Sequence, residues 1–182
     1  MTANPYEPQY TLARFWPRFG AYFLDGLIIG SFVLLFNYIN FTQLQSFALY
    51  LPVTIIGILY KPYMEYKYAA TLGKMAFKIK VTDYSLKKIS FKQSMLRSLI
   101  LFIPTLLYIP IYYLAFNNPN VNSTDFNGFN QQITESYPTF FWITSLTYVI
   151  SLTDLVVYLI DSEKQKRSLH DRIGETLVIK NE

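Results

Sequence analysis

The sequence predicts an all-α polytopic membrane protein with four transmembrane helices and a small cytoplasmic cap. Of its 182 residues, 52% are hydrophobic and only 15% are charged, against about 25% charged in an ordinary soluble domain. Four segments of 17 to 21 residues are nearly free of charge. As helices, each would reach roughly 25–32 Å, which matches the hydrocarbon core of a bilayer. The lysines and arginines lie outside these segments.

In chain order, the predicted transmembrane helices span residues 19–38, 44–60, 98–116 and 140–160, and we expect one membrane domain over residues 1–182. The first segment contains a single charge, Asp25, and the fourth contains only Asp154. The third contains Pro104 and Pro110, which we expect to kink it, with a gating role as the alternative.

The positions of the 16 basic residues predict the topology. Two precede the first helix, nine lie in the loop 61–97 and five follow the fourth helix, whereas the loops 39–43 and 117–139 contain none. By the positive-inside rule, both termini and the loop 61–97 are cytoplasmic and the loop 117–139 is outside. The net charge of +4 then reflects topology and contact with anionic lipids. We therefore expect the lipid bilayer as a partner and no nucleic acid.

The predicted cytoplasmic cap contains a short pair of strands. Apolar and polar residues alternate over 77–82, as in a half-exposed strand, and residues 176–180 have strand composition. We expect these segments to pair, because an isolated strand leaves its backbone unpaired. Ser90 and Gln93 form a capping-box pattern that predicts a helix start. The outer loop is rich in Asn and Gln, and we expect it to be solvated and mobile.

Intramembrane charges mark the candidate functional residues. Arg18 lies seven residues before Asp25 and therefore on nearly the same helix face. Asp25 and Asp154 should lie at one depth, roughly 9 Å from the cytoplasmic boundary. Together with Arg97 and Asp161, they predict a buried group of two arginines and three carboxylates. Two interpretations stay open: ion pairs that fix helix register, or a carboxylate that binds a cation or proton, as in transporters.

Enzymatic chemistry has little support in the sequence. The absence of cysteine excludes thiolate metal sites and cysteine nucleophiles, and a single histidine excludes two-histidine zinc motifs. Neither a phosphate-binding loop nor a serine nucleophile elbow occurs. We expect no enzyme activity and no cofactor, and the sequence identifies no metal site.

Three motifs resemble one family. They are RFGAYFLD at residues 18–25, TLGK at 71–74 with KVTD at 80–83, and SLHDRIGETLV at 168–178. The set is similar to the signatures of the RDD family of bacterial membrane proteins, which is named for one arginine and two aspartates. The resemblance assigns Arg18, Asp25 and Asp171 to those positions. Ala70 stands where the family pattern has Gln, and the Asn-rich outer loop is outside that pattern.

The resemblance implies a multi-pass protein of the bacterial cytoplasmic membrane and an association with transport, including sodium–proton exchange in some members. Asp171 would cap the short C-terminal helix or take part in ion handling. His170 would titrate near neutral pH and couple to such a site, or be incidental.

The candidate residues are thus Arg18, Asp25, Arg97, Asp154, Asp161 and Asp171. The leading expectation is movement of an ion or small solute. The alternative is an accessory or assembly subunit of a larger membrane complex, favoured by the small size and the lack of internal duplication. A homo-oligomer would supply the missing symmetry.

Overall fold

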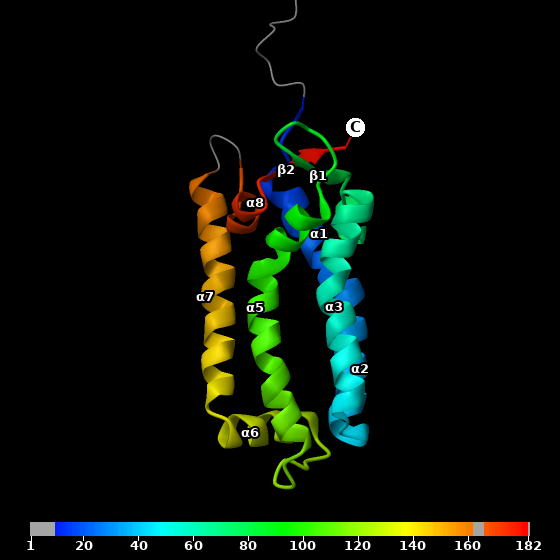
Figure 1. Ribbon diagram of the computed structural model, residues 1–182, viewed down its shortest axis with the longest axis vertical. Helices are drawn as coiled ribbons and strands as arrows, with labels where there is room; N and C mark the ends of the chain where they lie inside the picture. Colours follow the sequence, from blue (N-terminus) through cyan, green and yellow to red (C-terminus); the bar gives the residue numbers. More distant parts are fainter. Residues whose placement is uncertain (1–9, 162–165, 182) are drawn as a thin grey trace, which may run out of the picture.

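A computed structural model describes residues 10–161 and 166–181; at residue 101 it describes the backbone alone. Long helices run side by side along the molecule, two strands and two short helices lie at one end, and the helix α6 crosses the other end (Figure 1). We call these the cap end and the far end.

Among the described residues, three helices are long and apolar enough to span a membrane. The first is a continuous helix over Phe15–Leu44, built from α1 (Phe15–Asp25), η1 (Gly26–Gly30), α2 (Ser31–Ile39) and η2 (Asn40–Leu44), where η1 and η2 are π-helical. The others are α3 (Phe47–Tyr68) and α7 (Thr139–Ile160). The first and second helices extend beyond their apolar segments, because a helical backbone satisfies its own hydrogen bonds in water as well as in lipid.

The fourth span is α5 (Phe91–Phe116), if its two arms are counted as one. It begins with the predicted capping box. The backbone N–H of Gln93 donates to Ser90 Oγ (3.2 Å), and the backbone N–H of Ser90 donates to Gln93 Oε1 (2.9 Å). The arms Phe91–Ile100 and Phe102–Phe116 are bent by 65°. The bend lies one turn before Pro104, because proline removes the hydrogen bond to the carbonyl four residues earlier and its ring clashes with that carbonyl.

The cap end is built from α4 (Leu72–Ala76), β1 (Ile79–Asp83), α8 (Leu169–Ile173) and β2 (Thr176–Lys180). The strands pair antiparallel, with Ile79 opposite Lys180 and Asp83 opposite Thr176. The predicted strand pair is confirmed, although β1 begins two residues later than expected. The buried residues of the two strands pack against α1 and the segment before it. Together they form a small apolar core of Ala13, Ala21, Ile79, Val81, Ile89 and Val178.

The far end is closed by α6 (Phe126–Ser136), which begins where the Asp125 carboxylate accepts a hydrogen bond from the Gly128 amide (2.9 Å). Phe129 and Ile133 are fully buried and join an apolar cluster with Phe41, Tyr50 and Ile111. The prediction of a solvated outer loop over residues 117–132 is wrong at Phe129, which is fully buried, and the mobility of the loop stays a prediction. Phe126, Phe129 and Ile133 recur at helical spacing and give the segment an apolar face to bury.

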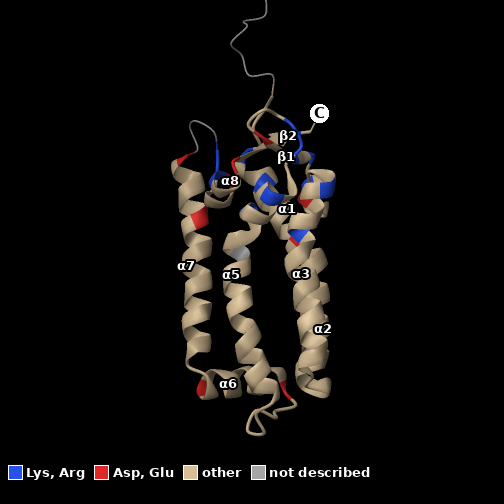
Figure 2. Cartoon of the chain, viewed as in Figure 1, with Lys and Arg blue, Asp and Glu red and all other residues tan. Residues whose placement is uncertain are grey.

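Charge is distributed unequally between the two ends. Lysine and arginine gather at the cap end, whereas the far end shows only acidic residues among its charges (Figure 2). The N-terminal segment joins the cap end, where the Ala13 backbone N–H donates to Val178 and the Lys180 backbone N–H of β2 donates to Thr11 (Figure 1). The charge asymmetry along the long axis is the one that the positive-inside rule describes.

Candidate functional site

Arg97 lies at the centre of a buried ion cluster at the cap end. The side chain is fully buried; its Nε donates to Glu65 Oε2 (2.9 Å) and its Nη1 donates to Asp171 Oδ1 (2.5 Å). The Arg18 Nη1 donates to the other Asp171 oxygen (2.5 Å), and the Lys74 ammonium binds the other Glu65 oxygen. We call these five residues the central ion cluster. They come from α1, α3, α4, α5 and α8 and therefore hold the cap onto the membrane helices.

The environment of the cluster sets the protonation of its members outside the membrane helices. Burial alone would raise the pKa of Asp171, but the charges of Arg97, His170 and Arg18 hold it well below its usual value. Burial lowers the pKa of Lys74 to about 8, although the Glu65 carboxylate opposes that shift. Asp171 is therefore ionised at neutral pH, and Lys74 loses its proton more easily than an exposed lysine.

Asp171 has a second structural role at the start of α8. The backbone N–H of Ser168 donates to Asp171 Oδ2 (3.2 Å), which completes a capping box. The predicted cap contact is therefore present, and the same carboxylate also bridges Arg18 and Arg97. The Asp171 Oδ2 atom accepts both from the Ser168 backbone N–H and from Arg18, so the start of α8 and the central ion cluster share this oxygen.

Asp25 lies in a separate site between α1, α3 and α4. Its carboxylate accepts hydrogen bonds from the Tyr60 hydroxyl (2.9 Å), the Thr71 hydroxyl (2.5 Å) and the Gly73 amide (2.8 Å). A Cβ atom at position 73 would overlap the backbone oxygen of Ala21. Glycine thus permits α4 to approach α1 closely enough for these bonds, which explains the TLGK motif physically.

The predicted pairing of Arg18 with Asp25 is wrong. The Arg18 side chain donates instead to the Ala13 backbone oxygen (3.1 Å) and to Asp171. The helical spacing placed both residues on one face correctly, but α4 and α8, which are distant in sequence, supply each of them with a different partner.

Asp154 of α7 has His170 as its partner, an assignment that the sequence did not make. One Asp154 oxygen accepts from the His170 backbone N–H (3.0 Å) and lies 2.9 Å from the ring Nδ1. Each side chain is about a quarter exposed (25% for His170, 26% for Asp154). Burial, together with the charge of Lys61, lowers the pKa of His170. The His170 Nε2 also lies 3.6 Å from Asp171, which links this pair to the central ion cluster.

Asp161 lies outside the central ion cluster and pairs with Arg172 (3.0 Å) and Arg167 (3.7 Å). The predicted group of two arginines with Asp25, Asp154 and Asp161 is therefore wrong, because none of these three carboxylates pairs with Arg18 or Arg97 among the described residues. Glu65 and Asp171 bind the arginines in their place.

Sequence reasoning missed Glu65 and Lys74 because both lie outside the apolar segments. A signal was present: Glu65 is the only acidic residue among the basic residues between positions 61 and 82. Among residues 10–161 and 166–181, no three His, Asp or Glu side chains are grouped in a way that could hold a metal ion.

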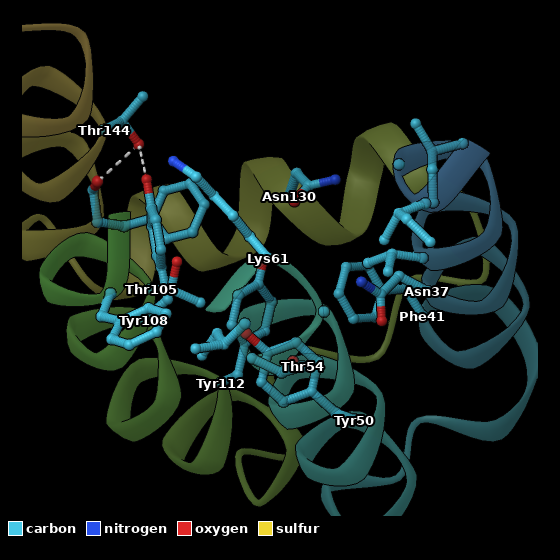
Figure 3. Close-up of a pocket in the computed structure, with 18 of the residues that line it drawn as sticks. Asn37, Phe41, Tyr50, Thr54, Lys61, Thr105, Tyr108, Tyr112, Asn130 and Thr144 are labelled. Atoms are coloured by element: carbon cyan, nitrogen blue, oxygen red, sulfur yellow. Dashed lines mark hydrogen bonds between the residues drawn. The ribbon is translucent and has the colours of Figure 1, made fainter. Parts of the chain in front are cut away.

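Two cavities lie between the helices. One of about 490 Å³, which we call the cap cavity, is lined by residues of the central ion cluster and by Asp25, Asp154 and His170. The other, of about 720 Å³, is lined by Tyr, Thr and Asn side chains and is the far cavity (Figure 3). Ile29, Gly30 and Lys61 line both cavities, and Lys61 is among the residues drawn around the far cavity (Figure 3).

The comparison with protein families agrees with the motifs. No curated protein and no solved structure matches the chain. The model of the RDD family matches residues 12–175, a range that includes Arg18, Asp25 and Asp171 as well as Glu65, Lys74 and Arg97. With this match over most of its length, the chain belongs to the RDD family.

Proposed function

We propose that this protein moves an ion or a small solute across the bacterial cytoplasmic membrane. The observation that carries the proposal is the pair of cavities that share Ile29, Gly30 and Lys61. Polar groups line both cavities beside apolar side chains, from Asp154 and His170 at the cap end to Asn37 and Thr144 toward the far end. Polar side chains at membrane depth are costly, and they commonly mark ion and substrate pathways.

Sodium–proton exchange is the specific form of this proposal, with Asp154 and His170 as the groups that take up and release the proton. They lie 2.9 Å apart, line the cap cavity and are partly exposed. A cation bound at the Asp154 carboxylate would stabilise its ionised form and disfavour a protonated His170. Arrival of sodium would thereby expel a proton.

Proton movement in proteoliposomes tests this form. Wild-type vesicles should take up or release protons when a sodium gradient is imposed, and Asp154→Asn should abolish this response in a protein that still folds. Glu135→Gln is the matched control, because Glu135 is exposed on α6 and lines neither cavity. Wild-type protein that moves no protons with sodium or potassium gradients between about pH 5 and 8, the range in which histidine titrates, would refute exchange.

The proposed orientation places the cap in the cytoplasm. A reporter that is active only in the cytoplasm should give signal when fused after Glu182 and none when fused within residues 120–130. Signal from the second fusion would overturn the orientation, because the basic cap end would then face outward.

An accessory or assembly subunit remains the second candidate, and the central ion cluster favours it. All four carboxylate oxygens of Glu65 and Asp171 are bound by cationic side chains of the same chain. Carboxylates that are saturated in this way fix geometry rather than bind a passing cation. The mass of the detergent-solubilised protein, with any co-purifying chains identified, separates this function from a self-sufficient transporter or homo-oligomer.

A further inference from the structure

Two arginine donors of the central ion cluster are buried without a partner. Among the described residues, neither Arg18 Nη2 nor Arg97 Nη2 has a hydrogen-bond acceptor, although both atoms are buried. Arg97 is fully buried, and both side chains line the cap cavity. A buried, charged donor without an acceptor is costly, so these groups indicate a site whose acceptor comes from outside the chain.

The arrangement of the two guanidinium groups suits an oxyanion. Each Nη1 donates to a different oxygen of Asp171 at 2.5 Å, so one carboxylate holds both groups side by side. Each then has one NH₂ group left over. Guanidinium groups bind carboxylate and phosphate oxygens through such paired donors.

The balance of hydrogen-bond donors around the cap cavity favours an anion as well, although the four cations there equal the four carboxylates in number. The central ion cluster contains three cations and two carboxylates. Lys61 also lines the cavity, and its amine has no ion pair among residues 10–161 and 166–181. The two carboxylates that line the cavity, those of Asp25 and Asp154, already accept hydrogen bonds within the chain. Unused donors therefore outnumber unused acceptors.

Much of the remaining lining of the cap cavity is apolar and comes from membrane-spanning helices. Phe19 and Tyr22 of α1 and Leu155 of α7 line it and are also exposed on the outer surface of those helices. At the cap end the two helices meet through Phe15 and Tyr158, whose ring centroids are 5.9 Å apart. An apolar rim at this depth faces lipid chains rather than water.

We propose that the cap cavity binds the phosphate group of an acidic phospholipid, with Arg18 and Arg97 as the oxyanion donors and Lys61 as a third cation. The acyl chains lie along the rim formed by Phe19, Tyr22 and Leu155. This site is independent of proton exchange, because it uses donors that Asp154 and His170 do not supply.

Native mass spectrometry and thermal unfolding of the purified full-length protein test the proposal with three probes. These are phosphatidylglycerol, phosphatidylcholine with the same acyl chains, and inorganic phosphate. Phosphatidylglycerol should bind at least about tenfold more tightly than phosphatidylcholine and should raise the melting temperature. Equal binding of the two lipids would overturn the proposal. Stabilisation by inorganic phosphate alone, without a preference between lipids, would show an oxyanion site for a soluble ligand and overturn the lipid source.

Variants then locate the binding. Arg18→Lys keeps a positive charge beside Asp171 but removes the spare NH₂ group, and Lys61→Met removes the third cation. Each should weaken phosphatidylglycerol binding about tenfold. Lys67→Met is the matched control on the same helix, because Lys67 is exposed and does not line the cavity. If Arg18→Lys does not fold, Lys61→Met decides alone: unchanged phosphatidylglycerol binding by Lys61→Met overturns the site. Proton flux is not measured, so the outcome is independent of the transport proposal.

Discussion

Replacing Glu65 with glutamine removes one of the two carboxylates of the central ion cluster at nearly constant side-chain size. Glu65 is fully buried and accepts from Arg97 Nε at 2.9 Å and from the Lys74 ammonium. A glutamine has one acceptor oxygen, so its NH₂ group would face one of the two cations, donor against donor. Three cations would then surround the single carboxylate of Asp171.

Breaking a buried ion pair by removing one partner costs about 3–5 kcal/mol. For a domain of this size, 1 kcal/mol corresponds to about 2–4 °C in melting temperature. We therefore expect Glu65→Gln to lower the melting temperature by about 6–20 °C. Removing the surplus cation as well, in the double variant Glu65→Gln with Lys74→Met, should restore part of this loss, because the two residues share one interaction.

The assay is thermal unfolding in detergent, followed by tryptophan fluorescence and by loss of the monodisperse peak in gel filtration. Glu135→Gln is the control, because the same chemical change at an exposed position costs at most about 0.5 kcal/mol. A melting temperature of Glu65→Gln equal to that of the control would refute the reasoning. So would a double variant less stable than the sum of the two single changes.

Three further predictions follow from the same geometry. The exchange Arg18→Asp with Asp25→Arg should not restore the stability lost by Asp25→Arg alone, because the two side chains bind different partners; recovery in thermal unfolding would show direct pairing. Gly73→Ala should lower the folded yield in gel filtration, because the added methyl group overlaps α1, whereas Gly26→Ala, with nothing within 4 Å, should leave it unchanged. The melting temperature should rise with pH from about 8 toward 10.5, because in this range Lys74 keeps its proton in the unfolded state and has released it in the folded state. Lys74→Met should flatten that rise, and an equal rise in the variant would show that another group causes it.

The sequence determined the membrane helices and their order. Long apolar segments can only be helices in a bilayer, because each backbone group must be satisfied within its own segment. The capping box at Ser90 is equally local, and each strand of the cap could be recognised from its own composition. The far end was predicted less well, because the Asn and Gln residues around α6 concealed the apolar spacing of Phe129 and Ile133.

The sequence also placed Arg18, Asp25, Arg97, Asp154 and Asp171 among the important charges, but it could not assign their partners. Helical periodicity relates residues that are three, four or seven positions apart on one helix. The actual partners are much farther apart in the chain: Thr71 lies 46 positions from Asp25, and Asp171 lies 153 positions from Arg18. Contacts over such separations depend on how the cap folds back onto the helices, which no local pattern encodes.

Only the tertiary structure decided which charges neutralise one another. In the structure, Glu65 lies beside Arg97, although it is beyond the predicted end of its helix. Asp25 accepts hydrogen bonds from neutral donors instead of pairing with an arginine. The physical reason is that a buried charge is bound by whichever opposite charge or donor the packed elements bring within about 3 Å. Local sequence sets the helices and their polarity; the docking of α4 and α8 onto them sets the ion pairs.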